Sequence, residues 1–129
     1  MLLKMDRYID LVIPRGGERL IRLVMAEATM PVLKPYKGVC HLYIDENCDF
    51  EKAVPIVENA KVQRPSACNA LETLLINRKA AEKFIPAFLD AMKRCNVELR
   101  GDADFCKYAP DAIPATEDDY YTEYLDLIL

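Results

Sequence analysis

The sequence predicts an α/β fold in which helices cover a mostly parallel sheet. Apolar, β-prone runs alternate along the chain with stretches whose apolar residues recur every three or four positions. This alternation is typical of layered α/β domains with parallel strands. The clearest helical stretch is 78–95, and its apolar stripe consists of Ala81, Phe84, Ile85, Phe88, Leu89 and Met92.

The first predicted elements are a strand and a helix joined by a glycine turn. Residues 7–13 form an apolar run that predicts a mostly buried strand, and the turn 14–17 closes it. A helix is predicted over 18–28, because apolar or small side chains fall on one face there, namely Leu20, Leu23, Val24 and Ala28. Residues 29–37 contain two prolines, which predicts an extended segment.

That extended segment predicts a domain boundary, with one domain over 1–32 and a second over 33–129. In the second domain a strand is predicted over 39–44. Asp49 is placed to cap a helix that begins near Phe50. The buried face of this helix is predicted to hold Ala53, Val57 and Ala60.

The helix that begins near Phe50 is predicted to end before Pro65, because proline disfavours helical geometry in the preceding residue. A buried strand is predicted over 73–76, after a polar connection. An edge-like strand is predicted over 96–100, and residues 124–129 resemble the beginning of another strand. The lone opening strand and this apolar end predict that the polypeptide is one portion of a longer chain.

Composition excludes several classes of function. The net charge is −4 and no long run of either sign occurs, which argues against non-specific binding to nucleic acid or an anionic membrane. The first residues lack the apolar core of a signal peptide, and no stretch approaches the length of a transmembrane span. A cytoplasmic location is therefore expected.

The cysteines do not form a recognisable framework. They number five and contain no C-x-x-C pair, so neither a disulfide scaffold nor a zinc site is predicted. His41 is the single histidine and adjoins Cys40 in a predicted strand, so the two side chains face opposite ways. It is interpreted as structural, and no metal site is expected.

Cys68 stands in the most suggestive stretch, a short connection between a predicted helix and a predicted buried strand. Functional side chains are often held in such loops. Ser66 and Asn69 supply a hydroxyl and an amide nearby, and Arg64 supplies a positive charge, which favours the nucleophilic thiolate. The alternative is that Cys68 is a small buried hydrophobic residue.

Pro14, Arg15, Gly16 and Gly17 form a second candidate site. A strand, a glycine turn and a helix together direct backbone N–H groups at an anion or a cofactor. The turn lacks the G-x-G-x-x-G pattern of dinucleotide sites and the lysine of a P-loop. Ordinary turn chemistry is the alternative explanation.

Three separated blocks, 8–17, 38–46 and 59–77, resemble the γ-glutamyl phosphate reductase family of the aldehyde dehydrogenase superfamily. The resemblance covers essentially the whole chain, less firmly from about Gly101, and corresponds to a middle part of the longer family chain. It implies a partial aldehyde-dehydrogenase-like fold and an NADPH-dependent reduction of L-glutamyl 5-phosphate to L-glutamate 5-semialdehyde in proline biosynthesis, with release of phosphate. It also implies that residues 1–32 are the terminal strand–helix unit of the cofactor-binding domain and that residues 33–129 are a catalytic domain truncated at its C-terminal side.

The resemblance also implies roles for single residues. Cys68 matches the family's nucleophile, which forms a thioester, and its own backbone N–H is a candidate oxyanion donor. Pro14, Arg15, Gly16 and Gly17 match the cofactor-binding edge. Lys34 stands about where hydrolytic relatives carry a glutamate base, which fits an enzyme whose thioester must be kept from activated water.

Three further residues are candidates for substrate binding, namely Arg64, Ser66 and Asn69. Arg64 either holds the phosphate or a substrate carboxylate, or pairs with a surface acid. Asn69 either orients the acyl group or caps the turn.

The resemblance further implies a homo-oligomer and glutamate 5-kinase as a partner of the intact enzyme. The isolated chain is expected to be inactive, since most of the cofactor domain lies elsewhere. The alternative is a truncated, non-catalytic unit that acts only in folding or assembly.

Overall fold

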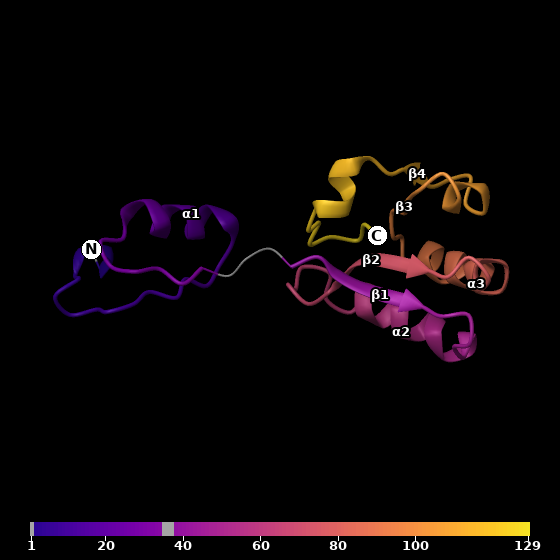
Figure 1. The fold of residues 1–129 in the computed structure, drawn as a ribbon, viewed down its shortest axis with the longest axis horizontal. Helices are drawn as coiled ribbons and strands as arrows, with labels where there is room; N and C mark the ends of the chain where they lie inside the picture. Colours follow the sequence, from indigo (N-terminus) through magenta and orange to yellow (C-terminus); the bar gives the residue numbers. More distant parts are fainter. Residues whose placement is uncertain (1, 35–37) are drawn as a thin grey trace. The chain divides into compact units, whose positions relative to one another are not determined.

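The computed structural model describes residues 2–34 and 38–129. The chain divides into two compact units, Met1–Lys37 and Gly38–Leu129, and each is described by itself (Figure 1). This division falls a few residues after the predicted boundary between residues 32 and 33. The assignment of the first 32 residues to a cofactor-binding domain stays a prediction, and Pro35 of the predicted extended segment lies outside the described residues.

The first unit contains a short 3-10 helix η1 (Leu2–Lys4) and the helix α1 (Glu18–Glu27), which confirms the predicted helix. The predicted strand over residues 7–13 is wrong, because pairing is limited to a single parallel bridge between Val12 and Val32. No other described segment pairs with residues 7–13, so the ladder cannot extend.

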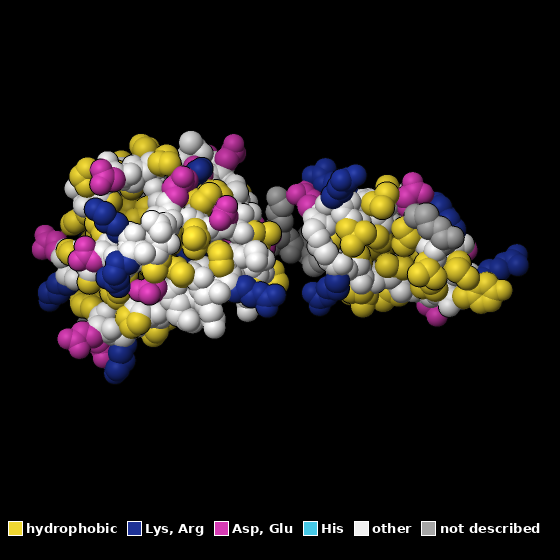
Figure 2. Space-filling model, turned by 180° about the vertical axis from the view of Figure 1, so that it is seen from behind, with side chains coloured by type: hydrophobic (Ala, Val, Ile, Leu, Met, Phe, Trp, Pro, Cys, Tyr) yellow, Lys and Arg dark blue, Asp and Glu magenta, His cyan; other side chains and the backbone are white. Residues whose placement is uncertain are grey.

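The first unit also leaves much of its apolar surface uncovered. Val24 of α1 and Met30 are buried, but Leu20 and Leu23 on the predicted inner face of the helix are 44% and 50% exposed. Tyr8, Leu11 and Ile13 are also exposed, so the predicted burial of their segment is wrong. Figure 2 shows hydrophobic side chains gathered over the visible face of this unit.

The second unit is built on a parallel strand pair with a crossover helix. Its main elements are β1 (Cys40–Ile44), α2 (Phe50–Val62), β2 (Leu71–Ile76) and α3 (Ala81–Arg94). β1 and β2 pair in parallel up to Ile44 and Ile76, with an irregularity between Cys40 and His41. Parallel neighbours require such a crossover, and the predicted α/β class with a parallel sheet is confirmed.

Local signals account for the bounds of α2. The Asp49 side chain accepts a hydrogen bond from the backbone N–H of Lys52, as predicted for a cap. The helix ends at Val62, and Pro65 follows after two further residues. The predicted buried face is confirmed at Ala53 and Val57.

The core lies between the strand pair and the two helices. Every member of the predicted α3 stripe is buried except the half-buried Leu89. The Phe84 and Phe88 rings stack with centroids 5.6 Å apart, and Phe105 meets Phe88 edge-on at 6.3 Å. The opposite face of β1 exposes His41 and Tyr43, so α2 and α3 cover one face of the strand pair.

The chain after α3 has little regular structure. Its elements are β3 (Arg100–Gly101), the 3-10 helix η2 (Phe105–Lys107), β4 (Ile113–Pro114) and the 3-10 helix η3 (Glu117–Tyr121), and β3 and β4 pair in parallel. The strand predicted over 96–100 is wrong before Arg100, since Asn96 adopts a left-handed φ of 54° and Glu98 forms a single bridge with Ile128.

The strand predicted over 124–129 is reduced to the single bridge between Glu98 and Ile128, because Leu125 has a φ of 56° and turns the chain. Within the described residues, every helix is too short or too polar to cross a membrane.

Candidate functional site

The connection between α2 and β2 consists of two consecutive turns. The amide of Ala67 donates to the Arg64 carbonyl at 3.0 Å, and the amide of Ala70 donates to the Ala67 carbonyl at 2.9 Å. Cys68 lies in the second turn and is exposed, whereas the other four cysteines are half-buried. The alternative reading of Cys68 as a buried hydrophobic residue is therefore wrong.

The backbone of Cys68 is anchored on one side and open on the other. Its carbonyl accepts a hydrogen bond from the Cys40 thiol at 3.6 Å. The amide N–H groups of Cys68 and Asn69 donate to no acceptor among the described residues. An exposed thiol beside two unpaired amides is an arrangement that can stabilise a thiolate or an oxyanion.

The neighbouring polar side chains are also unengaged. Arg64, Ser66 and Asn69 are exposed, and none of them forms a side-chain hydrogen bond or an ion pair within the described part of the chain. The structure thus shows neither the surface ion pair considered for Arg64 nor the cap considered for Asn69. All three side chains remain free to meet a substrate.

The turn from Pro14 to Gly17 belongs to the first unit, whereas the Cys68 connection belongs to the second. Pro14 is buried, while the next three residues are exposed. Gly16 adopts a φ of 148°, and a Cβ there would lie 2.7 Å from Leu20 Cδ2. Gly17 caps α1 without a side-chain hydrogen bond, so the helix N-terminus is open.

An open helix N-terminus attracts anions. Arg15 lies beside the turn, but Glu18 places a negative charge in the first turn of α1, where it pairs with Arg22 at 2.7 Å. The turn therefore fits the phosphate of a dinucleotide in its backbone geometry and only in part in its charge.

A buried ion pair, Lys61 with Glu72, stands beside the Cys68 connection and was missed from the sequence. The Lys61 Nζ lies 3.1 Å from Glu72 Oε2, and the side chains are 0% and 1% exposed. A sequence signal existed, since Lys61 continues the spacing of four that joins Ala53 and Val57 on the apolar face of α2. A charge on a buried face requires a buried partner.

A second cluster was also missed, around Asp119. Its carboxylate accepts hydrogen bonds from the Tyr124 hydroxyl, from the Arg100 guanidinium at 2.8 Å, and from the backbone and hydroxyl of Thr116 at 2.6 and 2.7 Å. These donors, Tyr124 first, hold the pKa of Asp119 well below its usual range. Burial and then the bond to Asp119 raise the pKa of Tyr124 to about 12.

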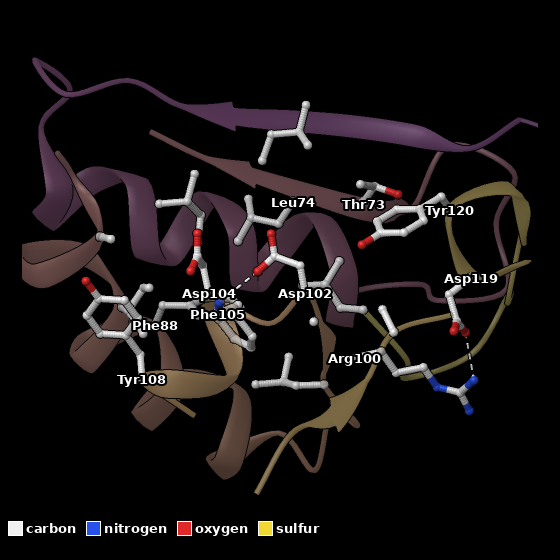
Figure 3. A pocket seen from close by; sticks show the side chains of 18 of the residues that line it. Thr73, Leu74, Phe88, Arg100, Asp102, Asp104, Phe105, Tyr108, Asp119 and Tyr120 are labelled. Carbon is white, nitrogen blue, oxygen red and sulfur yellow. Dashed lines mark hydrogen bonds and ion pairs between the residues drawn. The ribbon is translucent and has the colours of Figure 1, made fainter. Parts of the chain in front are cut away.

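A cavity of about 490 Å³ lies among β2, α3 and the segment that follows α3 (Figure 3). Thr73, Leu74, Phe88 and Phe105 line it, and the Arg100–Asp119 ion pair stands at its edge in the close-up. None of the residues 64–69 lines this cavity. The predicted chemistry therefore lies on the exposed connection and not in the cavity.

The comparisons with known proteins agree on one resemblance. No protein-family model matches the chain. It is 55% identical over 128 residues to γ-glutamyl phosphate reductase of Citrifermentans bemidjiense, covering 99% of this chain and 31% of the relative. The relative of the same name from Persephonella marina is 53% identical over 136 aligned residues, with the same coverage of both chains.

A solved structure extends the agreement to the fold. The crystal structure of γ-glutamyl phosphate reductase from Thermotoga maritima matches with a TM-score of 0.89 at 48% identity, over 99% of this chain and 31% of that one. The predicted resemblance to γ-glutamyl phosphate reductase is confirmed. The chain spans about a third of the length of the γ-glutamyl phosphate reductases that it matches.

A more distant solved structure is betaine aldehyde dehydrogenase from Staphylococcus aureus, in complex with NAD+. It matches with a TM-score of 0.58 at 26% identity, over 74% of this chain and 20% of that one. The predicted likeness to the aldehyde dehydrogenase fold is thus confirmed as well.

Proposed function

We propose that this chain supplies the nucleophilic cysteine for the NADPH-dependent reduction of L-glutamyl 5-phosphate to L-glutamate 5-semialdehyde, a step of proline biosynthesis. The observation that carries the proposal is the exposed Cys68 thiol on a two-turn connection beside unpaired amides and a free arginine. The likeness to γ-glutamyl phosphate reductases over 99% of the chain supports this reading of the thiol.

The first chemical step is acyl transfer to Cys68. The thiolate attacks the acyl carbon of the substrate, a C–S bond forms, and the carbonyl oxygen becomes an oxyanion. The unpaired Cys68 N–H is a donor for that oxyanion. The C–O bond to phosphate then breaks, phosphate leaves with the electron pair, and a thioester remains.

NADPH, when bound, supplies the hydride that reduces the thioester to the aldehyde and so returns Cys68 to its thiolate. The residues proposed to meet the cofactor are Pro14, Arg15, Gly16 and Gly17, at the open N-terminus of α1. The chain spans 31% of its relatives' length, and we expect the isolated chain to show no turnover. A homo-oligomer and an association with glutamate 5-kinase stay predictions.

Substrate recognition is assigned to the three free side chains around Cys68. The Arg64 guanidinium suits bidentate binding of the phosphate or of the α-carboxylate. Ser66 and Asn69 offer hydrogen bonds to the acyl group. Within the described part of the chain no hydrogen bond or ion pair holds any of these three side chains, so each can engage the substrate without breaking one.

The test is covalent labelling of the 129-residue chain with acetyl phosphate, followed by mass spectrometry of the peptides. We expect a hydroxylamine-sensitive acyl group on Cys68, because a thioester yields to that nucleophile. The Cys68→Ser variant should lose it, with labelling reduced by about 100-fold or more, because a serine hydroxyl is a much weaker nucleophile than a cysteine sulfur.

The matched control is Cys95→Ser, which removes a half-buried cysteine and should leave the labelling intact. Acylation distributed over several cysteines, or labelling that survives Cys68→Ser, would contradict the proposed role of Cys68.

A further inference from the structure

A charged pair lies in the interior of the second unit, where charges are costly. The side chains of Lys61 and Glu72 are 0% and 1% exposed, and their charged atoms are 3.1 Å apart. Taking two ions out of water often costs more than their attraction returns, so a buried pair is weak evidence for a role in stability. Its position in the fold suggests another role.

The pair closes a loop around the Cys68 connection. Lys61 lies in the last turn of α2, and Glu72 is the second residue of β2. The Lys61 Nζ also donates to the Leu71 carbonyl at 2.9 Å. A single ammonium group therefore holds the two ends of the connection together, and the turns that carry Cys68 lie between them.

The same carboxylate also holds a distant segment of the chain. Glu72 Oε1 accepts from the Leu125 amide at 3.1 Å, and Oε2 accepts from the Tyr124 amide at 3.4 Å. Leu125 adopts a φ of 56°, a left-handed conformation that is unfavourable for leucine. Such backbone strain persists only where the surrounding contacts impose it.

We propose that Lys61 and Glu72 are positioning residues that hold the Cys68 connection in its reactive geometry and tie it to the Tyr124–Leu125 segment. This inference rests on the nucleophilic role proposed above for Cys68. The pair does not touch the reacting atoms. It fixes the ends of the connection, and thereby the turn that carries the Cys68 thiol together with the Cys68 and Asn69 amides, which donate to no acceptor among the described residues.

The test compares the 129-residue chain with the K61M/E72Q double variant. The Lys61→Met change nearly preserves side-chain volume. The Glu72→Gln change keeps one acceptor oxygen, which can bond the Leu125 amide, while its NH2 group takes the place of the oxygen that accepted from the Tyr124 amide. The double variant therefore removes both charges without leaving a lone buried ion. K61M/E72M, which also leaves no buried ion and replaces both charges by apolar side chains, is the second variant if K61M/E72Q does not fold.

Two measurements report on the connection itself. We expect hydrogen exchange at the Ala67 and Ala70 amides to become about tenfold faster or more, because the turns open locally once their ends are released. We expect alkylation of Cys68 by iodoacetamide at pH 7 to become about threefold slower or more, because the thiol is then held less firmly in the geometry that the two turns impose.

The matched control is K79M/E46M, which removes an exposed ion pair of 2.9 Å at the other end of the same two strands. It should leave both readouts unchanged. A folded K61M/E72Q or K61M/E72M chain with unchanged exchange and alkylation at the connection would overturn the inference. Equal acceleration of exchange throughout the second unit would also overturn it, because the pair would then serve only global stability.

Neither readout requires turnover or an acyl phosphate. If acetyl phosphate fails to acylate Cys68 in the unmodified chain, the proposed function fails, whereas exchange and alkylation still decide the positioning role.

Discussion

At the scale of single residues, the chemistry of the second unit depends on which polar groups have partners. The Cys68 connection has an exposed thiol, and among the described residues its Cys68 and Asn69 amides and its Arg64 and Asn69 side chains have no partner. The Asp119 carboxylate is the opposite case, since four donor groups saturate it. Unengaged groups suit binding and catalysis, and saturated ones hold the structure together.

The saturation of Asp119 predicts a pH dependence of stability. Its folded-state pKa is lowered from the ordinary value of 3.8, first by the Tyr124 hydroxyl. The stability that the Asp119 carboxylate contributes to the fold is therefore present above pH 3.8 and is lost as the pH falls below that value. We expect Asp119→Asn to lower the free energy of unfolding at pH 7. Below about pH 4 the difference in this free energy between the variant and the unmodified chain should become progressively smaller.

Urea unfolding at a series of pH values from neutral to acidic measures this difference. The control is Asp118→Asn, because the Asp118 side chain is exposed and forms no hydrogen bond or ion pair within the described residues. If the free energies of unfolding of Asp119→Asn and the unmodified chain differ by the same amount at every pH, ionisation of Asp119 does not contribute to the stability of the fold.

At the scale of elements, the apolar stripe of α3 is the main support of the second unit. Phe84 is fully buried, with its ring centroid 6.3 Å from that of Phe50 and 5.6 Å from that of Phe88. It therefore links the start of α2 to the middle of α3. Lys83, its neighbour in the sequence, lies on the exposed face of the same helix.

Truncation of that ring tests the importance of the stripe. We expect Phe84→Ala to lower the free energy of unfolding by about 3–5 kcal/mol, because it removes buried apolar area and leaves a cavity. We expect the exposed control Lys83→Ala to change it by less than about 0.5 kcal/mol. Denaturant unfolding measures both, and a loss below about 1 kcal/mol for Phe84→Ala would show that the core does not depend on this contact.

At the scale of the whole molecule, the two units differ in how much core they possess. The hydrophobic core cluster lies entirely within the second unit, whereas the first unit buries Val24 and Met30 and exposes most of its other large apolar side chains. Stability in a protein follows buried apolar contacts and is not uniform along the chain. The first unit should accordingly open more readily.

Native-state hydrogen exchange tests this expectation. We expect the amides of α1 to exchange about 100-fold faster or more than those of α3, because few buried contacts oppose their opening. Val24→Ala should increase the difference in exchange rate between the two helices, because it should accelerate exchange in α1 alone. Exchange of both helices at one common rate would instead show that the chain opens as a single cooperative body.

The sequence by itself determined the elements whose signals are local. The stripe of α3, the Asp49 cap and Pro65 predicted helices and ends that the structure confirms, because periodicity, capping and proline geometry act within a few residues. The Cys68 connection followed from the same boundaries, and the proposal that Cys68 is the nucleophile came from the chain's resemblance to γ-glutamyl phosphate reductase.

Only the tertiary structure decided what depends on distant partners. A strand needs a neighbouring strand to pair with, so residues 7–13 and 124–129 form only a single bridge each despite their strand-like sequence. The burial of Lys61 against Glu72, and the bonds from Glu72 to Tyr124 and Leu125, join segments up to 53 positions apart. No local pattern specifies such a pairing, because the two charges attract each other strongly only where the folded chain excludes water from both.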